Sequence, residues 1–386
     1  MTTWLYLLLF KRRSTQTNTQ AGIDSMLQVI NLTTVKQFRA LEDEWRELSA
    51  QCPTASIFNG WDWLWNWWQV YGLQQPLALI TVRDECGQLQ GILPLYIAES
   101  KALKLAPVRE LRLIGTGGDT SPDYLGPLYR SDCGDSLFTL MCEAIDQLAA
   151  WDVARFTDLT NNTAFCNALA ARFGELDGCA QIRFIQLPSS FGEYLGTLSS
   201  NQRKQVRRRR RRFEEMGETR FYRWPATQAI DSAFDSLVAL HNKRWDGVED
   251  AGSFNTSKYL AFHRAVMQAL HTRDELRLYC LELNEQMIAM EYSYKWNDTI
   301  YSFQCGYDPQ FSELRPGQLL LNYSIENAIE EGLKEYDMLK GDYDYKVSAA
   351  KDQRETRSLQ SFRVTGAGRL ASFSSDLSAL KQRLRG

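Results

Sequence analysis

The order of predicted elements in residues 276–346 constrains the fold more than any other part of this sequence. Residues 276–283 alternate apolar and polar side chains as a half-buried strand does, and strands over 287–295 and 299–306 follow after short polar turns. A polar loop then enters an apolar-periodic helix over about 319–331, and a further strand covers 336–339. This order predicts an α/β domain whose sheet is mixed, as in α+β folds.

The loop before that helix reads Arg315-Pro316-Gly317-Gln318. The start of a helix offers free backbone N–H groups and the positive end of the helix dipole, here with a guanidinium beside them. Such a place suits a pyrophosphate. Proline at a helix start and glycine in a turn are also common where no ligand binds, so the same residues fit a plain loop.

Six short motifs follow one another in this half of the chain. They are residues 288–292, 306–309, 315–317, 331–332, 336–341 and 345–346. As an ordered set they resemble the GNAT-type acyltransferase domain of the bacterial cellulose-biosynthesis-type (CelD/BcsL-like) group, which belongs to the FemAB-like tandem-GNAT proteins. The resemblance extends upstream through 240–245 and the arginine-rich helix, and more faintly to Phe58, Trp61, Trp67, Trp68 and 91–95, so it covers roughly residues 30–365.

The resemblance implies two tandem GNAT-like units and acyl-CoA as the co-substrate. The second unit would transfer an acyl, acetyl-like group to an amine or hydroxyl acceptor in cell-envelope or exopolysaccharide metabolism. Two departures from the family pattern weaken the transfer of these expectations to this sequence. Only Arg315, Pro316 and Gly317 stand where a GNAT phosphate loop has several spaced glycines, and residues 347–350 lack an expected aromatic side chain.

Direct transfer from a thioester needs an oxyanion donor, a base and a hydrogen bond for the departing thiolate. By resemblance, the oxyanion donor is a backbone N–H where the strand ending near Gly306 splays from strand 336–339. Glu291 is one candidate base, because apolar neighbours would raise its pKa, and Asp342 and Asp308 are others.

Further site candidates lie close to these motifs. Tyr345, in the loop after strand 336–339, is expected to hydrogen bond the departing sulfur or the acceptor, and Lys346 to hold a phosphate or carboxylate. His241 and Trp245 belong to a Leu-His-x-x-Arg-Trp motif that recurs in the resembling family, with Trp245 and Asp308 as candidate substrate contacts. Each of these residues fits a structural role equally well.

Length and composition agree with two domains in one chain. A chain of 386 residues exceeds the usual size of one domain. The predicted divisions are an N-terminal extension (1–25), an N-terminal GNAT-like unit (26–188), a C-terminal acyltransferase domain (191–370) and a helical tail (371–386), with a seam at Pro188. Eight cysteines without C-x-x-C spacing favour a reducing cytoplasm.

The N-terminus carries only seven consecutive apolar residues, 4–10, followed by Lys11, Arg12 and Arg13. Seven residues cannot span a bilayer, and a signal peptide would have its charges before the apolar stretch. We therefore expect residues 1–25 to be a disordered extension, with Met26 as a possible start.

Residues 59–72 hold five tryptophans, of which Trp61, Trp65 and Trp68 share one helical face with Leu64. They fit burial against a sheet better than an open aromatic platform for a sugar or acyl chain. Before them, residues 35–49 predict one amphipathic helix; after them, 77–83 and 89–98 predict a hairpin.

Arginines fill every position from Arg207 to Arg212. On a helix they point all round, while Val206 and Phe213 give a narrow apolar stripe that could seat the helix. A solvated structural helix, a site for a polyanion such as a cofactor phosphate, and a site for tRNA all remain open. The net charge of −3 argues against a generally nucleic-acid-coating surface but allows a local basic patch.

Other chemistries find little support. Three histidines without a completing cysteine or carboxylate set predict no metal site, and no Gly-x-Ser-x-Gly elbow is present. Cys305 fits a packing residue of its strand. The alternatives to acyl-CoA-dependent transfer are a FemAB-like aminoacyltransferase that uses charged tRNA and a non-catalytic binding protein on the same fold.

Overall fold

The computed structural model describes residues 27–383 except 104, 149–150, 247–251 and 342. The predicted extension 1–25 and the possible start Met26 lie outside the described residues. By internal contacts the chain forms two compact units: residues 117–123 and 178–356 make unit 2, and the rest of the chain belongs to unit 1. The sequence-based domain boundaries at 188 and 370 remain a prediction.

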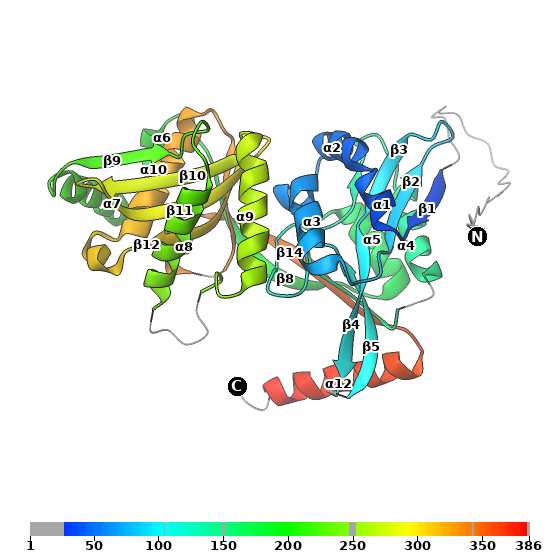
Figure 1. The fold of residues 1–386 in the computed structure, drawn as a ribbon. Coiled ribbons are helices and arrows are strands. Elements are labelled where there is room, and N and C mark those ends of the chain that lie inside the picture. The colour runs from blue at the N-terminus through cyan, green and yellow to red at the C-terminus, as the bar shows by residue number, and fades with distance from the viewer. Residues whose placement is uncertain (1–26, 104, 149–150, 247–251, 342, 384–386) are drawn as a thin grey trace. The chain divides into compact units, whose positions relative to one another are not determined.

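Unit 1 contains a four-stranded antiparallel sheet and a second group of strands (Figure 1). The sheet has the order β1 (Gln28–Leu32), β2 (Leu79–Arg83), β3 (Leu89–Leu93), β6 (Leu128–Tyr129). In the second group, β4 (Leu95–Ala102) pairs antiparallel with β5 (Ala106–Leu113), which runs parallel to β7 (Val153–Leu159). The end of β14 (Asp352–Phe362) pairs antiparallel with β7. The predicted strand 89–98 is thus two strands in different sheets, because Pro94 has no N–H to continue a ladder.

The helices of unit 1 are α1 (Val35–Arg39), α2 (Glu42–Gln51), α3 (Trp61–Trp67), α4 (Ser136–Gln147), α5 (Thr163–Phe173) and α12 (Gly366–Arg383), with short helical turns η1 (Ile57–Asn59) and η2 (Trp68–Gly72). The single helix predicted over 35–49 is two helices, α1 and α2. Thr34 caps α1 with a reciprocal capping box, and the acidic residues 42–44 fill the first turn of α2.

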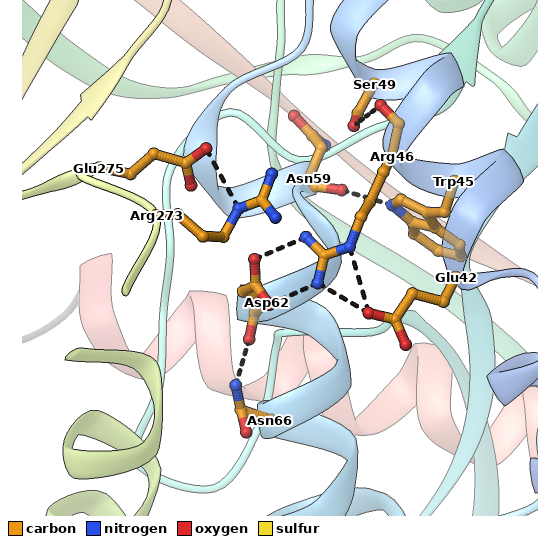
Figure 2. Close-up of polar contacts among 9 residues, drawn as sticks. All are labelled: Glu42, Trp45, Arg46, Ser49, Asn59, Asp62, Asn66, Arg273 and Glu275. Carbon is orange, nitrogen blue, oxygen red and sulfur yellow. Dashed lines mark hydrogen bonds and ion pairs between the residues drawn. The ribbon is translucent and has the colours of Figure 1, made fainter. Parts of the chain in front are cut away.

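The tryptophan-rich segment is part of the core of unit 1, as the burial interpretation expected. Trp61, Trp63, Trp67 and Trp68 are each at most 3 % exposed. Arg46 joins α2 to α3 by bonding both Glu42 and Asp62, and the Trp45 indole N–H donates to the Asn59 carbonyl (Figure 2). An open sugar platform is therefore not formed by these four rings.

Unit 2 is built on one mixed sheet in the order β8, β13, β12, β11, β10, β9, with the first half of β14 beside β8. The strands are β8 (Asp177–Gln186), β9 (Thr219–Arg223), β10 (Leu276–Leu283), β11 (Gln286–Trp296), β12 (Thr299–Tyr307) and β13 (Glu335–Lys340). β12 and β13 are parallel, and β9 to β12 are antiparallel neighbours. The three strands predicted between 276 and 306 agree with β10, β11 and β12 within one residue at each end.

The helices of unit 2 are α6 (Phe191–Thr197), α7 (Ser200–Glu214), α8 (Asp231–Trp245), α9 (Ser257–Thr272), α10 (Pro316–Glu330) and α11 (Asp344–Ala349), with the 3₁₀ turn η3 (Pro309–Leu314). α10 connects the parallel strands β12 and β13, as the sequence order predicted. Side chains alternate across β11, so Glu291 contacts Ser324 of α10 while Tyr292 packs on His263 of α9. The two helix layers thus cover opposite faces of this strand.

Two features of unit 2 differ from expectation. The segment with Tyr345 and Lys346 is the helix α11 rather than a loop, and β14 follows it, so strand 336–339 is not the last. α11 has six residues, too few to show the apolar period on which helix prediction depends.

Candidate functional site

A cavity of about 870 Å³ opens in unit 2 between α7, the start of α10 and the middle of the sheet. This volume lies within the range of small-molecule and cofactor sites. Its lining comprises Asn201, Gln205, Arg208, Arg209, Arg212, Arg244, Glu291, Ser302, Cys305, Tyr307, Ser312, Glu313, Leu314, Arg315, Pro316, Gly317, Gln318, Leu321 and Tyr345. Six of the predicted site residues therefore share one cavity: Arg315, Pro316, Gly317, Gln318, Glu291 and Tyr345.

The start of α10 forms one wall of this cavity. Arg315 is in the left-handed conformation (φ 56°), and Pro316 opens the helix as its first residue. The N–H groups of Gln318 and Leu319 donate to the Arg315 carbonyl at 2.9 and 3.1 Å. Among the described residues, no acceptor meets the N–H of Gly317. The expected group of free N–H donors is thus reduced to one, since proline has none and the next two are used.

Positive charge dominates the cavity wall. Five guanidinium groups contribute to the lining, from Arg208, Arg209, Arg212, Arg244 and Arg315. Burial, and then the neighbouring charges of Arg315 and Arg208, lower the pKa of Arg209 from its usual value. Like charges held together in this way are stabilised by an anion that enters between them.

Some of these cations have partners inside unit 2. Arg212 forms an ion pair of 2.6 Å with Glu313, whose side chain is 81 % exposed. Arg244 donates to the Cys305 carbonyl at 2.8 Å and stacks over the Tyr307 ring. An exposed ion pair such as Arg212–Glu313 is weak, so it leaves most of the positive field in place.

The arginines at 207–212 differ in where their side chains lie and in what they contact. Arg208, Arg209 and Arg212 are spaced i, i+1 and i+4, and this side of the helix faces the cavity. Arg210 anchors the helix instead: its guanidinium lies 4.3 Å from the Phe191 ring centroid and 4.2 Å from that of Tyr323. Arg207 and Arg211 are exposed and do not line the cavity.

Glu291 lies at the inner end of the cavity and is 3 % exposed. Its carboxylate accepts hydrogen bonds from Ser293 (2.7 Å), Ser302 (3.1 Å), Ser324 (3.2 Å) and Tyr336 (2.5 Å). Burial raises the pKa of Glu291 above its usual value, and these four hydroxyl donors oppose that rise. The raised pKa agrees with the direction expected from the sequence.

Tyr345 and Cys305 border the same inner region. Burial raises the pKa of the Tyr345 phenol well above its usual value, so this hydroxyl carries its proton at neutral pH. Burial also raises the pKa of the Cys305 thiol to about 12. Cys305 is half-buried and reaches the cavity wall, although the sequence suggested only a packing residue.

The parallel pair β12 and β13 separates beside this region. Their pairing covers only Thr299 to Tyr301 against Glu335 to Asp337. Beyond it, Ser302 and Cys305 of β12 line the cavity. The strands therefore diverge where the resemblance to GNAT domains placed a splay.

Other predicted site residues lie outside the cavity lining. Lys346 donates its ammonium hydrogens to the carbonyls of Leu339 and Lys340 at 2.9 and 2.7 Å. Asp308 caps η3 and pairs with Lys243 at 2.8 Å, which holds its pKa below the usual value. Both side chains have structural contacts that account for their burial.

His241 and Trp245 lie on α8 and do not line the cavity either. The His241 ring packs edge-on against Phe254, with 4.9 Å between ring centroids, and burial lowers its pKa to about 4. The backbone of His241 also closely approaches Gly306, where a Cβ would lie 2.5 Å from the His241 nitrogen. Asp342 lies outside the described residues.

Several cavity residues were not singled out from the sequence. Arg244 and Ser302 line the cavity, and Ser324 and Tyr336 lie behind it, where they bond Glu291. The division of the arginine run could have been inferred, because the apolar stripe of Val206 and Phe213 fixes which side of α7 faces the body. No cluster of three or more metal-binding side chains occurs in the described part of the chain.

Comparisons with known proteins support the fold. Residues 200–347 match the family model described as an acetyltransferase (GNAT) domain. Curated protein sequences give no match. The crystal structure of FemX is similar with a TM-score of 0.57 at 12 % identity, covering 87 % of this chain and 95 % of that one.

Two further solved structures share this fold. The C-terminal domain of a putative lysylphosphatidylglycerol synthetase from Agrobacterium fabrum has a TM-score of 0.52 at 9 % identity, covering 88 % of this chain and 96 % of that one. L-PGS from Bacillus licheniformis has a TM-score of 0.50 at 12 % identity, covering 81 % and 95 %. The predicted mixed α/β fold of tandem GNAT-like units is confirmed, and residues 200–347 are the part of the chain that is similar to GNAT acetyltransferase domains.

Proposed function

We propose that this protein is an acyltransferase that moves an acyl group from acyl-CoA to an amine or hydroxyl acceptor. One observation carries the proposal: a single cavity joins five guanidinium groups and the start of α10 to the buried Glu291 and to Tyr345. Phosphate-binding groups and proton-transfer groups thus border the same space. The GNAT match over residues 200–347 supports the same reaction class.

The donor's diphosphate is assigned to the wall between α7 and α10. Arg209 and Arg315 supply charge there, and the N–H of Gly317 supplies one main-chain donor at a helix start. Arg208 and Arg212 add charge at the exposed end of α7. The thioester then extends toward the region where β12 and β13 diverge.

The transfer step needs no covalent enzyme intermediate. The acceptor's nitrogen or oxygen attacks the thioester carbonyl carbon, the new bond to carbon forms, and the carbon–sulfur bond breaks. Glu291 takes the acceptor's proton, and its raised pKa brings it closer to the neutral range where a base works best. Tyr345 donates its phenolic hydrogen bond to the departing thiolate. The thiolate takes a proton from water, and Glu291 releases the acceptor's proton to water.

The high pKa of Cys305 supports direct transfer. A thiol with a pKa of about 12 is almost entirely protonated at neutral pH and is a poor nucleophile. His241, Asp308, Trp245 and Lys346 are not assigned catalytic or substrate-binding roles in this proposal, because their side chains lie outside the cavity lining.

A second candidate is transfer of an aminoacyl group from charged tRNA. The exposed Arg207 and Arg211, on the part of α7 that does not line the cavity, favour it, as does the shared fold with FemX. The similarity to a lysylphosphatidylglycerol synthetase domain supports an acceptor in the cell envelope. An exopolysaccharide acceptor rests on the sequence resemblance alone, as does a CelD/BcsL-like grouping.

The compartment proposed is a reducing one, the cytoplasm, because all eight cysteines are free thiols. As a separate finding, none of the helices described is both long enough and apolar enough to cross a lipid bilayer.

A binding titration with matched variants tests the function. Acetyl-CoA and an aminoacyl-tRNA are titrated into the wild type, the double variant Arg208→Gln/Arg209→Gln and the control Arg207→Gln/Arg211→Gln. Both variants remove two charges from the same helix, but only the first changes the cavity. We expect the first variant to weaken acetyl-CoA binding about tenfold or more and the control to change it less than about threefold.

Two results would contradict this proposal, the first by removing the diphosphate from the cavity wall and the second by removing acyl-CoA as the donor. Equal losses in both variants would mean that only the overall charge of α7 matters. Binding of tRNA that the control variant abolishes, without any binding of acetyl-CoA, would establish the tRNA-dependent alternative.

A further inference from the structure

A small pocket of about 80 Å³ adjoins the main cavity on its α7 side. Five residues line both spaces: Gln205, Arg209, Gln318, Leu321 and Tyr345. The shared Tyr345 places the small pocket beside the group assigned to the departing sulfur. A substituent on the thioester carbonyl would enter it directly from the main cavity.

The wall of the small pocket is about half apolar and half polar. Leu198, Val206 and Leu321 are buried side chains that line it, and Ala349 of α11 contributes a small one. The side-chain amides of Gln202 and Asn322 donate instead to backbone carbonyls, those of Ser348 and Gln318. Their hydrogen bonds are directed into the protein, so they add little polarity to the pocket.

Gln205, Arg209 and Gln318 are the polar residues shared with the main cavity. The side-chain oxygen of Gln318 differs from the other polar groups because it is buried and no donor within the described residues reaches it. A buried acceptor without a partner is destabilising unless an occupant supplies the missing hydrogen. Gln318 lines both spaces, so an occupant passing from the cavity into the small pocket meets this oxygen.

We propose, on the basis of the function proposed above, that the small pocket receives the acyl group of the donor, restricts it to short chains, and favours those that carry a hydroxyl or amino group. An apolar cavity of about 150 Å³ holds one benzene molecule, so 80 Å³ accommodates about three or four non-hydrogen atoms. Acetyl to butanoyl groups fit this space, and longer chains do not. Gln318 accepts the hydrogen bond of a substituent such as that of a 3-hydroxybutanoyl group.

The test measures affinity for a series of non-hydrolysable acyl-CoA thioether analogues, together with desulfo-CoA, which carries no acyl group. For the wild type we expect similar affinities up to butanoyl, at least a tenfold loss at hexanoyl, and a two- to tenfold gain for 3-hydroxybutanoyl over butanoyl.

Two variants change the pocket in opposite directions. Leu198→Ala should move the loss from hexanoyl to chains about three carbons longer, because it removes that much of the wall. Ala349→Leu should weaken butanoyl binding about tenfold while leaving desulfo-CoA unchanged. Gln318→Leu should abolish the advantage of the hydroxyl group.

The outcomes separate this proposal from the one on which it rests. If desulfo-CoA does not bind, acyl-CoA is not the donor and both proposals fail. If desulfo-CoA binds but affinity is independent of chain length, or its limit is the same in both pocket variants, only the size restriction is overturned. Equal affinity for butanoyl and 3-hydroxybutanoyl would overturn the role of Gln318.

Discussion

Tyr336 donates a hydrogen bond of 2.5 Å to Glu291, and both side chains are almost completely buried. The pair joins β13 to β11 across the intervening strand β12, at the inner end of the cavity. It fixes the orientation of the carboxylate together with Ser293 and Ser302, which bond the same oxygen, Oε1, while Ser324 bonds Oε2. The group proposed as base is therefore held rigidly on strands rather than on a loop.

Glu291→Gln should lower kcat about a hundredfold or more, because an amide of similar shape cannot take the acceptor's proton. Donor affinity should change less than about threefold, since Glu291 is not assigned to the diphosphate. Steady-state kinetics and a direct donor titration check this prediction. An unchanged kcat would remove Glu291 from the proton-transfer role.

Ser324→Ala should shift the acid limb of the kcat/KM profile toward higher pH. The Ser324 hydroxyl lies 3.2 Å from the Glu291 carboxylate and lowers the pKa of that group, so its loss raises the pKa further. A higher pKa means that the base is lost to protonation at a higher pH. Rates measured from pH 5 to 9 test this, and a profile that stays in place would show that the limb belongs to another group.

The order of elements in the second half of the chain was readable from the sequence, because β10, β11 and β12 carry clear period-two patterns and a polar turn separates each pair. The position of Arg315 to Gln318 at the entrance of this helix followed from the same reasoning, although α10 begins at Pro316, three residues before the predicted start. The predictions that failed here concern a short segment. α11 is a short helix without a full apolar repeat, and its formation depends on contacts with the body of unit 2.

The assembly of the cavity was harder to predict from the sequence. The Arg315 carbonyl accepts from the N–H groups of Gln318 and Leu319 because Arg315 is in the left-handed conformation. No residue type in this stretch predicts that conformation. Likewise, Lys346 was predicted to hold a phosphate or carboxylate, whereas here two carbonyl groups receive its hydrogens.

Tyr345→Phe should lower kcat about tenfold to a hundredfold without changing stability by more than about 0.5 kcal/mol. No hydrogen bond of the Tyr345 hydroxyl occurs within the described part of the chain, so phenylalanine preserves the packing. Kinetics with thermal denaturation of both proteins checks this. A comparable loss of rate and of stability together would indicate a packing role instead.

Arg210→Ala should destabilise unit 2 by about 2 kcal/mol, because it removes stacking on two rings and a charge-assisted hydrogen bond to Glu326 of 2.6 Å. Arg211→Ala is the matched control. Its only ion pair within the described residues, with Glu215 at 3.5 Å, joins two exposed side chains, and its loss should cost less than about 0.5 kcal/mol. Urea unfolding of the two variants tests the division of the arginine run, and equal effects would contradict it.

Lys346→Met should remove a rise in stability that the wild type shows between about pH 8 and pH 10.5. Burial lowers the pKa of Lys346 to about 8, against an ordinary value of 10.5 in the unfolded chain. Between these values the unfolded chain binds more protons than the folded one, so the free energy of unfolding increases with pH, by at most about 3 kcal/mol. Other groups titrate in this window, but they do so in both proteins, so the difference between the two unfolding curves isolates Lys346. If that difference is constant from pH 7 to 10.5, the lysine keeps its ordinary pKa, and its ammonium group is in contact with water rather than with the carbonyls of Leu339 and Lys340.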